Sequence, residues 1–127
     1  MMTEKSRHEE CFMRDKCAKY DECPMIIVQN MLAGKWKILI LWYLGYSTLR
    51  FSDLQRKLPQ VTQKVLARQL KSLEQDHLIH RKVYPVVPPK VEYSLTEEGE
   101  KFLSILSMMH RFGAEHLEEF QPQEFQS

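Results

Sequence analysis

The chain has 127 residues, a formal net charge of +1 and 43% hydrophobic residues, which predicts one folded domain and excludes both a multi-domain enzyme and a disordered chain. The first ten residues are too charged for a signal peptide, and the longest apolar run, Ile38–Leu44, is far shorter than the roughly 20 residues of a membrane span. We therefore expect a cytoplasmic protein without a membrane partner, and three cysteines, an odd number, favour free thiols over a disulfide framework.

Residues 1–22 are predicted to form an N-terminal, cysteine-containing arm, and helical periodicity begins after it. Residues 24–32 read as a short helix, and residues 35–46 as a second helix that is apolar on nearly all sides. The second helix should therefore be the central and most buried one. A third, short helix follows and ends before Pro59; Ser52, with Gln55 three residues later, resembles a capping box at its start.

The strongest helical pattern lies after Pro59. Thr62 is the expected N-cap of a helix over residues 63–76. At 100° per residue, one side of this helix is apolar and the other polar or basic. The apolar side carries Leu66, Leu70 and Leu73, and the other side carries Lys64, Arg68, Lys71 and Gln75. The segment thus predicts a helix that buries leucines and exposes cations.

Two strands and a long helix complete the chain. Residues 78–84 and 90–95 read as strands, and the proline-rich tip between them suits a projecting loop. Thr96 is the expected N-cap of the last helix, whose apolar stripe runs from Phe102 towards Phe120. We expect residues 121–127 to fray, which leaves one domain over residues 23–120. The predicted fold class is α+β, mainly α.

Basic charge is concentrated in the middle of the chain. Residues 47–95 carry nine basic and four acidic side chains, whereas residues 96–127 carry two basic and seven acidic ones. A basic centre beside an acidic end can bind a polyanion through one face. Chance segregation of solvated charge is the alternative interpretation.

The basic segment reads helix, turn, helix, strand, loop, strand, which is the order of a winged helix-turn-helix with a two-stranded wing. In such a module the second helix lies in the major groove of DNA, with its N-terminal residues near base edges. Gln can pair with adenine, and Arg or Lys with guanine, while other polar residues contact phosphates. The candidate DNA-binding residues are Ser52, Thr62, Gln63, Lys64, Arg68, Lys71, Arg81, Lys82 and Lys90. A winged helix that binds another protein is the alternative, but the retained basic face favours DNA.

Several short motifs are similar to those of one known family. They are Ala33-Gly34-Lys35-Trp36-Lys37, Leu49-Arg50-Phe51-Ser52-Asp53-Leu54, the leucines from Leu66 through Leu70 to Leu73-Glu74, and Val83-Tyr84-Pro85 through Pro88-Pro89-Lys90-Val91-Glu92-Tyr93-Ser94-Leu95-Thr96 with Gly99. From about Cys23 to His116 the chain resembles the HxlR-type branch of the MarR-like bacterial transcriptional regulators. The resemblance implies a homodimeric, DNA-binding winged-helix regulator whose recognition helix covers residues 62–75.

One residue departs from the pattern of this family. His77 stands where the family usually has a glycine that closes the recognition helix. A histidine in a left-handed cap would cost about 1 kcal/mol relative to glycine. We therefore expect either a different cap or a tolerated strain at this position.

A dimer would place two recognition helices in successive major-groove turns, about 34 Å apart. We therefore expect a two-fold symmetric homodimer on a pseudo-palindromic operator, with the last helix as a dimerisation helix. The candidate interface residues are Ile26, Ile27, Met31, Phe102, Ile105, Leu106, Met109 and Phe112. Part of both apolar stripes is also expected to cover the domain's own core.

The three cysteines precede the first helix. Cys11, Cys17 and Cys23 are separated by five residues in both intervals, and cations lie between them, which raises thiol reactivity. In part of the HxlR-type family a thiol at the position of Cys23 senses oxidants or electrophiles, so the resemblance makes Cys23 the candidate sensor. Cys11 and Cys17 are candidate resolving thiols. One alternative is a small buried cysteine without a sensing role. Another is a regulator that responds to a ligand or a metal and senses no redox change.

Neither a metal site nor an enzyme is favoured. His8 and the three cysteines could supply four zinc ligands, but their spacing does not match the paired ligands of structural zinc sites. The chain has no phosphate-binding glycine loop, nucleophile elbow or HExxH motif. We expect a regulator that uses no cofactor.

Overall fold

The computed structural model describes residues 23–119, which divide into two compact units. The boundary lies between Lys35 and Trp36. The first unit contains helix α2 (Pro24–Met31). Cys23 is its N-cap and Pro24 is its first residue. At this first position the missing N–H of proline costs nothing. The predicted arm, residues 1–22, and tail, residues 121–127, lie outside the described residues.

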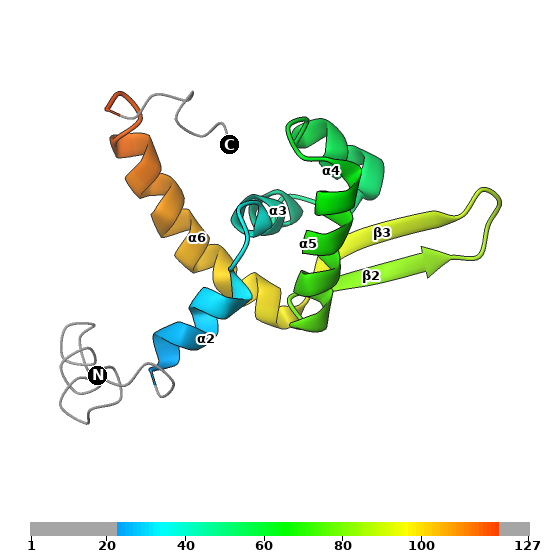
Figure 1. Cartoon of the computed structure of the whole chain (residues 1–127), viewed down its shortest axis with the longest axis horizontal. Coiled ribbons are helices and arrows are strands. Elements are labelled where there is room, and N and C mark those ends of the chain that lie inside the picture. The colour runs from blue at the N-terminus through cyan, green and yellow to red at the C-terminus, as the bar shows by residue number, and fades with distance from the viewer. Residues whose placement is uncertain (1–22, 120–127) are drawn as a thin grey trace. The chain divides into compact units, whose positions relative to one another are not determined.

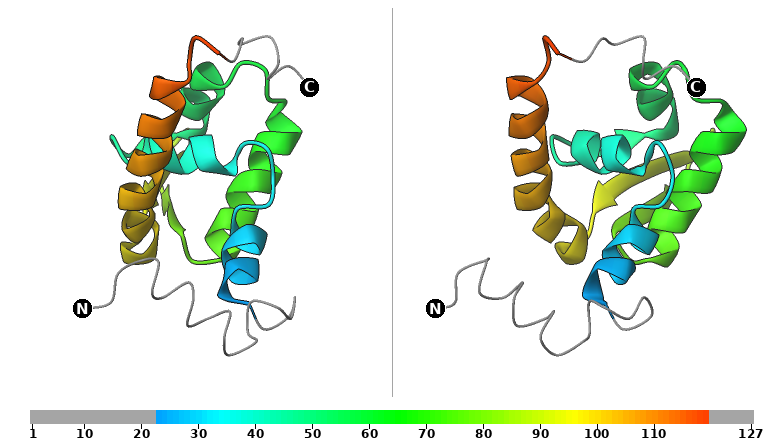
Figure 2. Two further views of the ribbon diagram at one scale, coloured as in Figure 1. Left: turned by 90° about the vertical axis from the view of Figure 1, so that its left-hand side faces the viewer. Right: turned by 60° about the vertical axis from the view of Figure 1, so that its left-hand side comes forward.

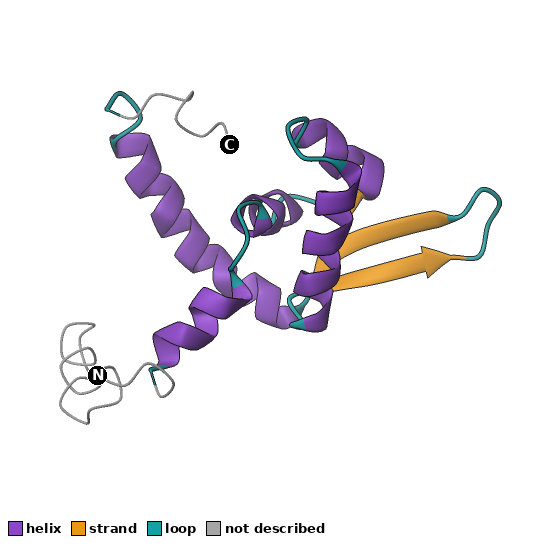
Figure 3. Ribbon diagram, viewed as in Figure 1, coloured by secondary structure: helices purple, strands orange, loops and turns teal. Residues whose placement is uncertain are grey.

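The second unit contains every other element of the described chain (Figures 1 and 3). In order these are α3 (Lys37–Leu44), β1 (Leu49–Arg50), α4 (Phe51–Lys57), α5 (Gln63–Gln75), β2 (Ile79–Tyr84), β3 (Lys90–Leu95) and α6 (Glu97–Glu115). The strands form one antiparallel sheet in the order β1-β3-β2. This architecture confirms the predicted α+β, mainly helical winged helix-turn-helix.

Strand β1 is an addition to the predicted two-stranded wing. It pairs Leu49 with Tyr93 and Arg50 with Glu92 of β3. Two residues are too few for an alternating pattern, so no periodicity predicts this strand. The short strand anchors the start of α4, and with it the helix-turn-helix, to the base of the wing.

Helix α3 lies at the centre of the second unit, between α5 and α6 (Figure 2). Ile40, Leu41 and Leu44 are buried there, although Leu39 stays 37% exposed. The leucine stripe of α5 is also buried, at Leu66, Leu70 and Leu73. The predicted central helix and the predicted buried face of α5 are therefore confirmed.

The capping prediction is correct for α5 and wrong for α4. Thr62 caps α5, since its Oγ1 accepts a hydrogen bond from the Val65 amide at 3.2 Å. The predicted capping box on Ser52 and Gln55 is wrong: Ser52 is the second residue of α4, and Asp53 accepts the hydrogen bond from the Arg50 amide at 3.0 Å. That bond and the Arg56 guanidinium lower the pKa of the Asp53 carboxyl.

The connection from α5 to β2 is hydrogen-bonded to the start of α6. His77 has a φ of 61°, so it adopts the left-handed conformation that favours glycine. Thr96 Oγ1 accepts from the Gly99 amide at 3.0 Å and donates to the His77 carbonyl at 2.6 Å. This confirms Thr96 as the cap of α6, and shows that the left-handed cap persists with histidine in place of glycine.

No helix among residues 23–119 is long and apolar enough to cross a membrane.

Candidate nucleic-acid interface

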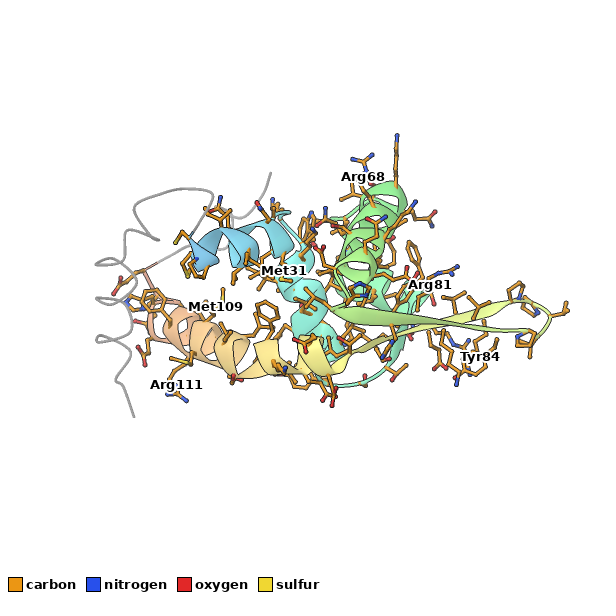
Figure 4. The ribbon with its side chains drawn as sticks, turned by 90° about the horizontal axis from the view of Figure 1, so that it is seen from below. Met31, Arg68, Arg81, Tyr84, Met109 and Arg111 are labelled. Atoms are coloured by element: carbon orange, nitrogen blue, oxygen red, sulfur yellow. The ribbon has the colours of Figure 1, made fainter. Side chains whose placement is uncertain are left out.

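The outer side of α5 carries exposed cations. Lys64, Arg68 and Lys71 are all exposed, opposite the buried leucines, and Figure 4 shows Arg68 pointing away from the body of the second unit. Within residues 23–119 none of the three forms an ion pair. Their charges are therefore not neutralised by the described chain and can attract an anion.

The start of α5 is held by the preceding helix. Thr62 and Gln63 are exposed beside Lys64. The amide of the Gln55 side chain in α4 donates hydrogen bonds to the carbonyl oxygens of Leu58 and Val61, so it spans the turn of the helix-turn-helix. This bridge fixes the first turn of α5 relative to α4, on which Ser52 is also exposed.

A buried lysine, which sequence reasoning missed, holds the C-terminal part of α5. Among the charged residues of the described chain only Lys37 is buried, with 4% of its surface exposed. Its Nζ donates a hydrogen bond to Ser72 Oγ of α5 at 2.6 Å. Lys37 lies in the first turn of α3, where a lysine usually reads as solvated, so no sequence signal distinguished it.

The wing presents cations on both of its faces. In the β2–β3 register Arg81 is opposite Tyr93, Lys82 opposite Glu92, and Tyr84 opposite Lys90. Because successive side chains of a strand point to opposite faces, Arg81 lies on one face and both lysines lie on the other. Figure 4 shows Arg81 on the side of the wing towards α5 and Tyr84 on the opposite side. The three predicted wing cations therefore do not form a single cluster.

Tyr84 brings the two wing lysines together. The Nζ atom of Lys82 lies 4.9 Å from the centre of the Tyr84 ring, and that of Lys90 lies 4.8 Å from it. Lys90 is also 3.8 Å from the Glu92 carboxylate. Sequence reasoning missed Tyr84, because only the strand register shows that it faces Lys90.

The predicted interface residues of α6 fall into two groups. Phe102 and Leu106 are 9% and 2% exposed, because they pack in the core of the second unit and are not free for a partner. Ile105, Met109 and Phe112 are 48%, 43% and 63% exposed. These three, with the equally exposed Met108, form an apolar stripe along the outer side of α6.

In the first unit, Ile27 of α2 is exposed, and Ile26 and Met31 are half-buried. Cys23 is half-buried, with a free thiol. Cys11 and Cys17 lie outside the described residues. Among residues 23–119 no group of three or more His, Cys, Asp or Glu side chains could hold a metal ion.

The model of the HxlR-like helix-turn-helix family matches residues 31–121. The chain belongs to this family. A candidate regulatory protein, MalR, of Fusobacterium mortiferum is 49% identical over 96 residues, which cover 75% of this chain and 91% of MalR. The protein is therefore a winged-helix transcriptional regulator of the HxlR and MarR-like type, as the sequence resemblance predicted.

Two solved structures support the same assignment. The redox regulator HypR in its oxidised form is 40% identical, with a TM-score of 0.70, and the match covers 73% of this chain and 96% of HypR. The candidate HTH-type transcriptional regulator YtcD is 43% identical, with a TM-score of 0.72, and the match covers 75% of this chain and 97% of YtcD. All three of these relatives of the HxlR-like protein are named as regulators.

Proposed function

We propose that the protein is a homodimeric regulator that binds a pseudo-palindromic operator in double-stranded DNA, with α5 in the major groove and the wing on the backbone or in the minor groove. The observation that carries the proposal is the row of exposed cations on α5, none of which has an ion-pair partner within residues 23–119. A regulator acts where the DNA is, so its proposed location is the bacterial cytoplasm.

Each part of the surface has a distinct proposed role. Residues at the start of the recognition helix read base edges, since this end of the helix approaches the groove first. They are Thr62, Gln63, Lys64 and Arg68. Phosphate contacts come from Ser52, Lys71, Arg81, Lys82 and Lys90, which lie on the flanks of the helix-turn-helix and on the wing.

The homodimer is proposed to form through the exposed stripe of α6, with α2 as a second contributor through Ile26, Ile27 and Met31. Ile105, Met108, Met109 and Phe112 recur at helical spacing and together leave an apolar surface of the kind that marks interfaces. A two-fold axis through such a stripe would bury it against its own copy.

Phe112→Glu tests this interface, because it places a charge within the proposed apolar contact. Sedimentation at micromolar concentration is expected to give a monomer, and binding to a two-half-site duplex is expected to fall by at least tenfold. Ser107→Glu is the matched control, since Ser107 is exposed on another side of α6. A wild-type protein that sediments as a monomer would refute the proposed dimer.

We also propose that thiol chemistry at Cys23 changes DNA binding. The proposal is supported by the free, half-buried thiol at the start of α2 and by the similarity to HypR, a redox regulator. Diamide would take two electrons and two protons from a pair of thiols as they join in a disulfide, with Cys11 or Cys17 as the candidate second thiol.

Diamide is therefore expected to change the DNA affinity of the wild-type protein and not that of Cys23→Ser. Binding would be followed by gel shift, with and without later reduction by dithiothreitol. If both proteins respond equally to diamide, Cys23 is a structural residue and not a sensor. The proposed DNA binding would be unaffected by that result.

A further inference from the structure

The wing face opposite Arg81 carries three side chains that form a compact site. Lys82 and Tyr84 belong to β2, and Lys90 is the direct cross-strand partner of Tyr84. Both ammonium groups lie within cation–π distance of the same ring, at 4.9 and 4.8 Å from its centre. The site thus holds two positive charges over one aromatic side chain.

Two lysines near each other would ordinarily separate, because like charges repel and long side chains gain entropy in solvent. The negative face of an aromatic ring offsets this repulsion without neutralising either charge. Within residues 23–119 these two ammonium groups form one ion pair, which joins Lys90 to the Glu92 carboxylate at 3.8 Å. One carboxylate against two ammonium groups leaves a net positive site.

We propose that Lys82, Tyr84 and Lys90 form a phosphate clamp, in which the lysines bind backbone phosphates of DNA and Tyr84 is a positioning residue. The inference rests on the proposed function and deepens it. Arg81 would contact the backbone on the α5 side of the wing, and the clamp would contact it on the other side. A narrow ribbon with cations on both faces suits the minor groove, which a phosphate backbone borders on each side.

The test uses a labelled duplex of mixed sequence at low salt, since non-specific binding depends mainly on phosphate contacts and requires no operator. Tyr84→Leu removes the ring and no charge, so an affinity loss of about three- to tenfold is expected. Tyr84→Phe keeps the ring and should bind as tightly as wild type. Val83→Ala, at an exposed residue on the Arg81 face, is the matched control and should change nothing.

Two further measurements separate positioning from a general effect on folding. In NMR spectra of the free protein, the ε-methylene protons of Lys82 and Lys90 should show upfield ring-current shifts that Tyr84→Leu abolishes and Tyr84→Phe preserves. Glu92→Gln should tighten binding, because it removes the carboxylate that competes with phosphate. In a cycle of Lys82→Gln and Lys90→Gln, the two losses should be non-additive.

The outcomes distinguish the clamp from the function on which it rests. If wild type binds the duplex and Tyr84→Leu binds equally well, or if the two lysine losses simply add, the clamp is overturned and the proposed function stands. If wild type does not bind duplex DNA at all, the proposed function fails, and the clamp fails with it.

Discussion

Replacing Arg68 with alanine is expected to weaken operator binding by about 1–3 kcal/mol, a factor of roughly 5–150, and to relax the preference for one base pair. The side chain is exposed on the outer face of α5 and forms no ion pair within the described chain. Lys64→Ala should have a similar effect, because Lys64 lies one turn closer to the start of the helix. Fluorescence anisotropy with the operator and with single-base variants of it measures both quantities.

Two matched variants control for the loss of a positive charge. Arg81→Ala should weaken binding to all sequences about equally, since a phosphate contact carries no base information. Lys101→Ala should leave affinity unchanged, because Lys101 lies on α6, where it pairs with Glu98 at 2.9 Å. If Lys64→Ala, Arg68→Ala and Arg81→Ala all bind like wild type, the assignment of this surface is wrong.

Gly99→Ala is expected to reduce the free energy of unfolding by about 3 kcal/mol or more. A Cβ atom at this position would lie 2.1 Å from the Leu78 carbonyl oxygen and 3.2 Å from the carbonyl carbon. Both atoms belong to the backbone, which cannot move aside as a flexible side chain can. The affected contact joins α6 to the start of β2, so the damage should reach the base of the wing.

Gly113→Ala is the matched control in the same helix. Nothing lies within 4 Å of a Cβ atom at Gly113, so alanine should stabilise the protein by about 0.5–1 kcal/mol through its higher helix propensity. Urea denaturation followed by circular dichroism gives both values. Equal stabilities of Gly99→Ala and wild type would mean that α6 and β2 do not approach each other as described.

Much of the fold follows from local sequence signals. Thr62 and Thr96 cap the helices they were expected to cap, because a threonine before a helical pattern has a specific hydrogen-bonding role. The leucine stripe of α5 is buried as its periodicity predicted. The cap of α4 was mispredicted, because the helix begins before Ser52. The short strand β1 ends at Arg50, which becomes the N-cap, and Asp53 is then the third residue of the helix.

The candidate site was only partly predictable, because its remaining features depend on pairings between distant segments. The exposed cations of α5 follow from one helical period. The opposite placement of Arg81 and Lys82 follows from side-chain alternation within one predicted strand, whereas the contact of Tyr84 with Lys90 depends on the strand register, which no single segment encodes. The burial of Lys37 against Ser72 likewise joins residues 35 positions apart.

The most direct test of DNA binding through the cations of α5 and the wing is a titration with DNA from upstream of the protein's own gene at two salt concentrations. Neutralised phosphates release counterions, so the logarithm of the binding constant should fall steeply with the logarithm of the salt concentration, by about 0.9 for each phosphate contact. Arg81→Ala should reduce this slope by about one contact. A shallow slope, or no binding, would contradict the account and favour a winged helix that binds another protein.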